Sequence, residues 1–144
     1  MSDNTDIQSI QNRTLNGKTN RRKGFNAERL YAKIFRNLGY DKCKTTRESS
    51  RLLDSCKVDL NFLPILVQIK AGIQKKFNAS KTLFLMNEEL NKHYDKNSEI
   101  LDMPKIIIHH TACMKNKKRT EYDDLVIMTF NTFKRFLKDY NKTN

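Results

Sequence analysis

A carboxylate, an amide and an ammonium group lie close together in the sequence, at Asp59, Gln68 and Lys70. The residues around them alternate between apolar and polar, which predicts two β-strands, Lys57–Phe62 and Ile65–Lys70. With the turn at Leu63-Pro64, Asp59 faces Gln68 directly, and Lys70 lies diagonally opposite on the same face. The alternative is an ordinary solvated outer face of a sheet.

Glu28 supplies a second carboxylate, from a predicted helix. Apolar residues at helical spacing predict this helix over Phe25–Leu38, with Gly39 as its terminator. Glu28 lies at the flank of the apolar stripe, where a carboxylate is held close to the sheet. The alternative is a boundary residue whose head group reaches water.

These groups together suggest a metal site for phosphodiester hydrolysis. Mg²⁺ takes hard oxygen ligands and keeps several waters, so one or two carboxylates with a substrate phosphate suffice. The reaction needs an activated water and neutralisation of developing charge, and a metal supplies both. An ammonium such as that of Lys70 can hold the water or stabilise the charge.

The same residues belong to a longer series of motifs, which resembles the PD-(D/E)xK nuclease superfamily and, more narrowly, the archaeal-type Holliday junction resolvases. In chain order the motifs are Arg22-Lys23-Gly24, Ala27-Glu28-Arg29, Thr46-Arg47-Glu48-Ser49-Ser50, Val58-Asp59-Leu60 and Gln68-Ile69-Lys70-Ala71. The resemblance implies a restriction-endonuclease-like α/β fold, with a central mixed sheet flanked by helices. It also implies a homodimer that binds four-way DNA junctions and nicks two opposed strands with Mg²⁺.

The resemblance assigns roles residue by residue. Glu28 matches the family's helix-borne metal-site Glu, Asp59 its central metal-binding Asp, and Lys70 its catalytic Lys. Gln68 stands where the family usually has a second strand carboxylate, so the site has one negative charge fewer. An amide oxygen can still bind a hard cation. Glu28, Asp59 and Gln68 are therefore the expected ligands of Mg²⁺, for which Mn²⁺ is expected to substitute.

Two assignments in the loop before the hairpin stay open. Ser49 or Ser50 falls near the family's loop serine, which acts close to the scissile phosphate, and Ser50 is the candidate catalytic residue. Asp54 could also approach the site, although a solvated loop acid is the simpler interpretation.

The charge of the chain indicates a polyanionic partner. Lys and Arg number 28 against 16 Asp and Glu, which gives a formal net charge of +12. Nucleic acid is the commonest partner of such a domain, and a basic surface without a partner is the alternative. The expected DNA-binding residues are Arg21, Arg22, Lys23, Arg47, Lys75, Lys76, Lys117 and Lys118.

Composition divides the chain into a flexible tail at residues 1–20, poor in apolar side chains, and a single nuclease domain at residues 21–144. Besides the elements above, the sequence predicts strands at Tyr40–Arg47, Lys105–His109 and Leu125–Phe130, helices at Ser80–Tyr94 and Asn131–Tyr140, and loops at Arg47–Ser55 and Cys113–Asp123. The expected order is α-β-β-β-α-β-β-α, an α/β domain.

The expected location is the cytoplasm, or the host cytoplasm for a phage-encoded protein. No window approaches the ~18 consecutive apolar residues of a membrane span, and the polar N-terminus does not suit a signal peptide. The three cysteines include no C-x-x-C pair and suit a reducing compartment.

The expected function is that of a Mg²⁺-dependent endodeoxyribonuclease, which resolves four-way junctions by paired symmetric nicks. One alternative keeps the chemistry but acts on other DNA, such as a flap, a mismatch or a restriction-type site. Another is a junction-binding protein without catalysis, which the neutral Gln68 motivates.

Overall fold

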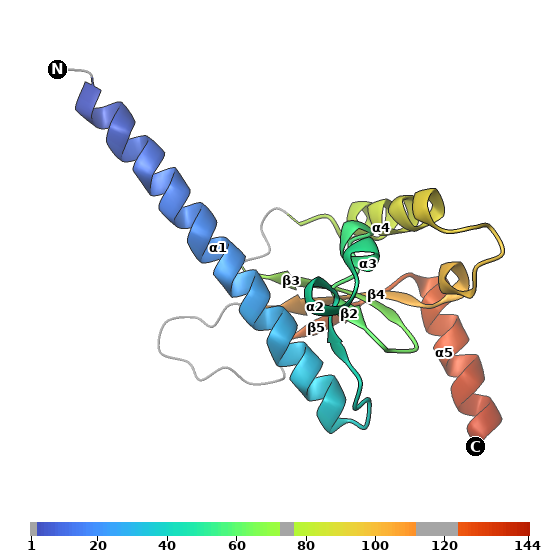
Figure 1. The fold of residues 1–144 in the computed structure, drawn as a ribbon. Coiled ribbons are helices and arrows are strands. Elements are labelled where there is room, and N and C mark those ends of the chain that lie inside the picture. Colours follow the sequence, from blue (N-terminus) through green and yellow to red (C-terminus); the bar gives the residue numbers. More distant parts are fainter. Residues whose placement is uncertain (1–2, 73–76, 112–123) are drawn as a thin grey trace.

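The computed structural model describes residues 3–72, 77–111 and 124–144, with side chains from residue 17 onward. The elements, labelled in Figure 1, are α1 (Asp3–Asn37), β1 (Lys44–Thr45), α2 (Thr46–Ser49), α3 (Arg51–Ser55), β2 (Leu60–Asn61), β3 (Leu66–Ala71), α4 (Ala79–His93), the 3-10 helix η1 (Glu99–Asp102), β4 (Lys105–His110), β5 (Leu125–Ile127) and α5 (Phe130–Thr143). The chain is therefore α/β, as its sequence predicts.

The five strands form one mixed sheet in the order β1-β2-β3-β4-β5. The β1–β2, β2–β3 and β4–β5 pairs are antiparallel, and β3 and β4 are parallel. A parallel pair needs a long crossover, and α4 with η1 supplies it. The central strands β3 and β4 are buried on both faces, which suits their continuous apolar sequences.

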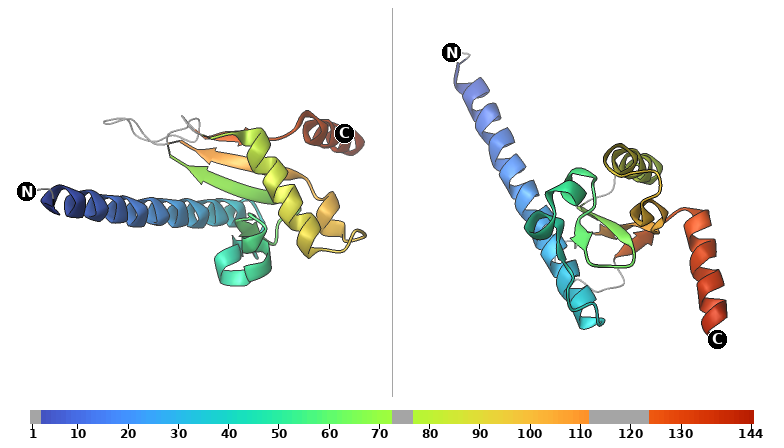
Figure 2. Two further views of the ribbon diagram at one scale, coloured as in Figure 1. Left: turned by 90° about the horizontal axis from the view of Figure 1, so that it is seen from above. Right: turned by 45° about the vertical axis from the view of Figure 1, so that its right-hand side comes forward.

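Two apolar cores hold the helices to the sheet. On β3, Val67 and Ile69 pack with Ala27 and Tyr31 of α1. Leu66 belongs to a second core, which contains Met86 and Leu90 of α4 and Leu53, Cys56 and Val58 from the segment before β2. Because alternate residues of a strand point to opposite faces, α1 and α4 cover different sides of β3 (Figure 2).

The predicted hairpin register is confirmed. Leu60 pairs with Val67, the partner expected when the turn lies at Leu63-Pro64. The alternation of apolar and polar residues determines the register, because a slip of one residue would turn the apolar side chains away from the cores.

Several predicted boundaries are wrong. Helix α1 begins at Asp3 instead of Phe25, and it thus includes most of the predicted tail; no proline interrupts this part of the chain. The predicted loop at Arg47–Ser55 contains α2 and α3, where Ser50 caps α3 by accepting the Leu53 N–H. Whether the domain divides at residue 20 stays a prediction.

Two further strand boundaries differ from those expected, and the predicted Cys113–Asp123 loop lies outside the described residues. The predicted strand Tyr40–Arg47 contains only the short β1. The predicted strand Leu125–Phe130 ends at Ile127, because Thr129 caps α5 by accepting the Thr132 N–H. Helix α5 therefore begins at Phe130, one residue before the predicted start at Asn131.

Candidate active site

A β-bulge places Asp59. Leu60 pairs with Val67, and the Asp59 N–H also donates to the Val67 carbonyl, at 2.8 Å. Two residues of one strand therefore face one residue of the other, an arrangement that redirects side chains near active sites. The predicted pairing of Asp59 with Gln68 is shifted by one residue at this point.

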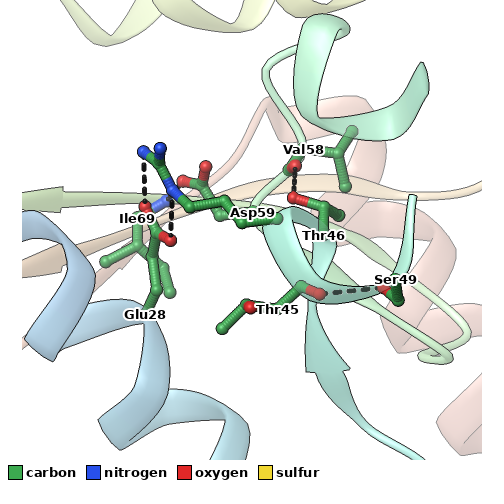
Figure 3. Close-up of polar contacts among 8 residues, drawn as sticks. Glu28, Thr45, Thr46, Ser49, Val58, Asp59 and Ile69 are labelled. Atoms are coloured by element: carbon green, nitrogen blue, oxygen red, sulfur yellow. Dashed lines mark hydrogen bonds and ion pairs between the residues drawn. The ribbon is translucent and has the colours of Figure 1, made fainter. Parts of the chain in front are cut away.

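Thr46 holds the bulge in place. Its hydroxyl donates to the Val58 carbonyl at 2.7 Å, and its backbone N–H donates to the Asp59 carbonyl at 2.9 Å (Figure 3). Thr46 is completely buried. It is a positioning residue that the sequence analysis missed, because a threonine beside charged residues gives no signal of burial.

The surroundings of the Asp59 carboxyl disfavour its charged form. The pKa of Asp59 is raised from 3.8 to about 7, chiefly by burial and to a smaller extent by the charge of Glu28. The Ile69 N–H, which donates to Asp59 Oδ2 at 2.6 Å, and the charges of Lys70 and Arg47 oppose this rise in pKa. A raised pKa of this kind is typical of functional carboxylates.

Glu28 forms an ion pair with Arg47. The Arg47 Nε donates to Glu28 Oε2 at 2.9 Å, and Nη2 donates to Oε1 at 3.3 Å (Figure 3). The guanidinium also lies over the Phe25 ring, 4.2 Å from its centroid. The Glu28 side chain is 7% exposed and that of Arg47 is 47% exposed. The expected metal ligand Glu28 is thus neutralised by the expected DNA-binding residue Arg47.

Replacing Arg47 with methionine is expected to destabilise the fold by about 1–2 kcal/mol. Glu28 would become a buried carboxylate without a partner, and solvent around the half-exposed Arg47 limits the effect. Urea unfolding measures the change. The double variant Glu28→Gln/Arg47→Met removes both charges and should recover most of the loss. An Arg47→Met protein as stable as the wild type would contradict this account of the pair.

Gln68 and Lys70 lie on the face of β3 that points away from α1. Gln68 is buried, and its Oε1 atom has no hydrogen-bond partner in the part of the chain that the structure describes. A buried polar atom without a hydrogen-bond partner calls for an explanation. A role as ligand for a cation would be one such explanation. Lys70 is half-buried, and its charge acts on Asp59.

Oxygen donors of the kind that a hard cation takes are present on Glu28, Asp59 and Gln68. Within the described ranges, no group of three or more His, Cys, Asp or Glu side chains could hold a metal ion. Glu28 and Asp59 supply carboxylate oxygens, and Gln68 adds a neutral oxygen that is otherwise unused. One or two carboxylates with amide oxygen and water suit Mg²⁺.

Both loop serines make local hydrogen bonds. The Ser49 hydroxyl donates to the Thr45 carbonyl at 2.8 Å and accepts from Asn61 Nδ2 at 3.2 Å. The Ser50 hydroxyl accepts a hydrogen bond from the Leu53 N–H. Among the described groups it donates to no acceptor, so its proton is available for a ligand. This difference favours Ser50 as the candidate.

The basic residues fall into three groups. Arg21, Arg22 and Lys23 are exposed on α1, and Arg47 is paired with Glu28. The hydrogen bond that Arg47 donates to Glu28 raises the pKa of Arg47, and the nearby charges of Asp54 and Asp59 add to this effect. The expected DNA-binding residues Lys75, Lys76, Lys117 and Lys118 lie outside the described residues.

The histidines of β4 belong to structural contacts. His109 is buried, stacks on Phe77 and lies 3.0 Å from the Gly72 carbonyl through Nε2. His110 Nδ1 lies 3.2 Å from Asp124 Oδ1, and the Tyr31 hydroxyl donates to the same carboxylate. This second group ties α1 to β4 and the start of β5.

Comparison of the chain with protein-family models, with curated proteins and with solved structures found no match in any of the three. Of the helices that the structure describes, none has the length and apolar character needed to span a membrane.

Proposed function

We propose that the protein is a metal-dependent, structure-selective DNA endonuclease with a restriction-endonuclease-like fold, and that it resolves four-way junctions by paired nicks. The observation that carries the proposal is the state of Asp59. A bulge and the Ile69 N–H fix its carboxylate, and burial, aided by the charge of Glu28, raises its pKa to about 7 against the opposing charges of Lys70 and Arg47. The ordered motifs from Arg22 to Ala71 support the same function.

Glu28, Asp59 and Gln68 would hold the cation. When bound, Mg²⁺ would supply an activated water and neutralise charge on the phosphate. Asp59 would have to be deprotonated to hold the cation, so its raised pKa would make metal affinity depend on pH. The Lys70 ammonium stabilises negative charge that develops on the phosphate oxygens. The free Ser50 proton can hydrogen-bond a phosphate oxygen.

The exposed basic side chains of α1 supply affinity for DNA phosphates that does not depend on base sequence. Replacing Arg21, Arg22 and Lys23 together with glutamine is expected to lower the slope of log K against log salt by about 2–3, since each phosphate contact contributes about 0.9. Junction binding measured by fluorescence anisotropy from low to moderate salt tests this. An unchanged slope would show that this part of α1 does not contact phosphate.

A panel of DNA substrates tests the specificity. A mobile four-way junction, a flap, a linear duplex and a single strand are incubated with the protein and Mg²⁺ under identical conditions. The proposal expects the junction to be cut fastest. Equal rates on all four would remove the claim of junction selectivity and leave a general nuclease.

A binding module without catalysis is the second candidate. The neutral Gln68 and the Arg47 guanidinium on Glu28 favour it, because both reduce the negative charge available to a cation. It predicts tight, salt-dependent junction binding without nicks in Mg²⁺ or Mn²⁺. Any nick that depends on Lys70 would exclude it.

A further inference from the structure

The guanidinium of Arg47 occupies the carboxylate that α1 offers to a metal ion. Arg47 donates to both oxygens of Glu28, from Nε to Oε2 at 2.9 Å and from Nη2 to Oε1 at 3.3 Å. The Glu28 side chain is 7% exposed, so little of the carboxylate is left open to another cation. A hard cation binds carboxylates through these same oxygens. The metal and the guanidinium therefore compete for Glu28.

Arg47 is held in this position by a second contact but is not enclosed by the core. Its guanidinium lies over the Phe25 ring, 4.2 Å from the centroid. Phe25 precedes Glu28 by three residues, so one turn of α1 supplies both contacts. The Arg47 side chain is nevertheless 47% exposed. With this exposure, the guanidinium can move to a ligand in solvent while the elements around it stay folded.

The surface beside this ion pair offers a place for a phosphate group. A cavity of about 150 Å³ lies there, and its lining includes Arg29, a second arginine that is exposed on α1. Guanidinium groups bind phosphate through paired N–H groups, as they bind carboxylates. A phosphate in this cavity would therefore attract the guanidinium that Glu28 holds. The residues that line the cavity are Phe25, Glu28, Arg29, Thr45, Arg47 and Glu48.

Departure of Arg47 would leave two carboxyl groups that favour a cation. The charge of Glu28 raises the pKa of Asp59, and the charge of Arg47 lowers it, so the three groups act on one another. In the DNA-free protein, Arg47 supplies positive charge that a metal ion would otherwise supply. Once Arg47 moves away, Glu28 becomes a buried charge without a partner, and binding a cation relieves that cost.

We propose that the contact between Arg47 and Glu28 is autoinhibitory and that DNA releases it. In the DNA-free protein the guanidinium blocks Glu28, and when a junction binds, the guanidinium moves to a backbone phosphate and leaves Glu28 to the metal. This inference deepens the proposed function and rests on its assignment of Glu28 as a metal ligand. DNA and metal then bind cooperatively, and each raises the affinity for the other by the same factor.

Binding of Mn²⁺ to the DNA-free, full-length protein tests the autoinhibitory contact, with the free ion measured by electron paramagnetic resonance. Arg47→Met is expected to bind Mn²⁺ at least about tenfold more tightly than the wild type, within the range typical of coupling between two sites. Loss of an arginine that only supports the structure of the site would lower the affinity instead. Far-UV circular dichroism verifies that the variant is folded.

Two further variants are the controls. Arg51→Met removes an exposed arginine at the start of α3, so it changes the net charge equally and should leave Mn²⁺ affinity nearly unchanged. The double variant Glu28→Gln/Arg47→Met also removes the carboxylate, so it should lose the gain in affinity. A gain that persists in the double variant would show that Glu28 is not the group that Arg47 blocks.

Junction affinity gives a second measurement of the same coupling. Lys70→Ala is used as the background, because it is expected to bind the junction without cutting it. Fluorescence anisotropy then measures how much Mn²⁺ raises junction affinity. The increase should be larger with Arg47 present than with methionine in its place, because only Arg47 exchanges Glu28 for phosphate. Equal increases would contradict the exchange.

An Arg47→Met protein that binds Mn²⁺ no more tightly than the wild type would overturn the proposal. If that variant does not fold, Arg47→Lys replaces it, since lysine keeps the charge but loses the paired N–H contact. Arg47→Lys should also bind Mn²⁺ more tightly than the wild type, and an unchanged affinity would overturn the proposal equally.

Cleavage assays separate this failure from that of the proposed function. A wild type that cuts junctions, with no gain of Mn²⁺ affinity in Arg47→Met, removes the autoinhibitory contact and leaves the nuclease proposal standing. A gain of affinity in a protein that never cuts confirms the contact and removes the nuclease proposal. Absence of Mn²⁺ binding in every variant, with and without DNA, would overturn both.

Discussion

Lys70→Ala is expected to reduce junction cleavage by at least about 100-fold while leaving junction affinity nearly unchanged. Loss of a single group that stabilises transition-state charge typically costs this much. The structure brings the Lys70 charge near Asp59, where it opposes the rise in the pKa of that carboxyl. Binding should persist because Lys70 is one of 28 Lys and Arg residues. Single-turnover cleavage and anisotropy on the same junction measure both quantities.

The matched control for this variant is Lys81→Ala. Lys81 is an exposed lysine in the first turn of α4, outside the candidate site. Its removal changes the net charge equally, so it should alter cleavage only slightly. Cleavage by Lys70→Ala at the wild-type rate would show that the catalytic site lies elsewhere.

Asp59→Asn is expected to abolish cleavage and yet stabilise the metal-free protein at alkaline pH. The pKa of Asp59 is 3.8 in its ordinary environment and about 7 in the folded protein. Below about pH 4 the carboxyl is protonated in both states and imposes no penalty. Between about pH 4 and 7 the unfolded chain releases its proton first, so the fold loses stability as the pH rises. The loss is complete above about pH 7.

The size of this effect follows from the pKa difference, which corresponds to at most about 4 kcal/mol. Asparagine keeps an oxygen that can accept from the Ile69 N–H, so Asp59→Asn should gain about 2–4 kcal/mol at pH 8 and almost nothing near pH 4. Urea unfolding at both pH values measures this, with Asp95→Asn at the surface as a control. A gain that does not depend on pH would contradict the ionisation account.

The same carboxyl gives cleavage a distinctive pH dependence. A cation and a proton compete for Asp59, so the cleavage rate should rise with pH. The midpoint of that rise should move to lower pH as Mg²⁺ is increased. A midpoint that is independent of Mg²⁺ would show that Asp59 does not bind the cation.

The sequence predicts short-range features of this site well. The register of β2 and β3 follows from the alternation of apolar residues, and the edge position of Glu28 on α1 follows from helical spacing. Both are properties of one or two adjacent elements. The bulge at Asp59 was not predicted, because it depends on Thr46 from a separate segment.

Contacts between distant segments account for the other differences. Arg47 was expected to face DNA, but Glu28 and Phe25 of α1 bind its guanidinium. Charge alone does not distinguish an arginine that awaits phosphate from one that is paired within the fold. The exposure of the aromatic residues of α5 was not predicted either, since helical spacing does not reveal which side of a helix the sheet covers.

The most direct test of the account is strand-specific mapping of cuts on a four-way junction. Each of the four strands is labelled in turn, and the junction is incubated with wild-type protein and Mg²⁺ beside Lys70→Ala. The account predicts nicks at symmetric positions in two opposed strands, made by the wild type and absent with the variant. A junction that is bound but uncut in both Mg²⁺ and Mn²⁺ would contradict it.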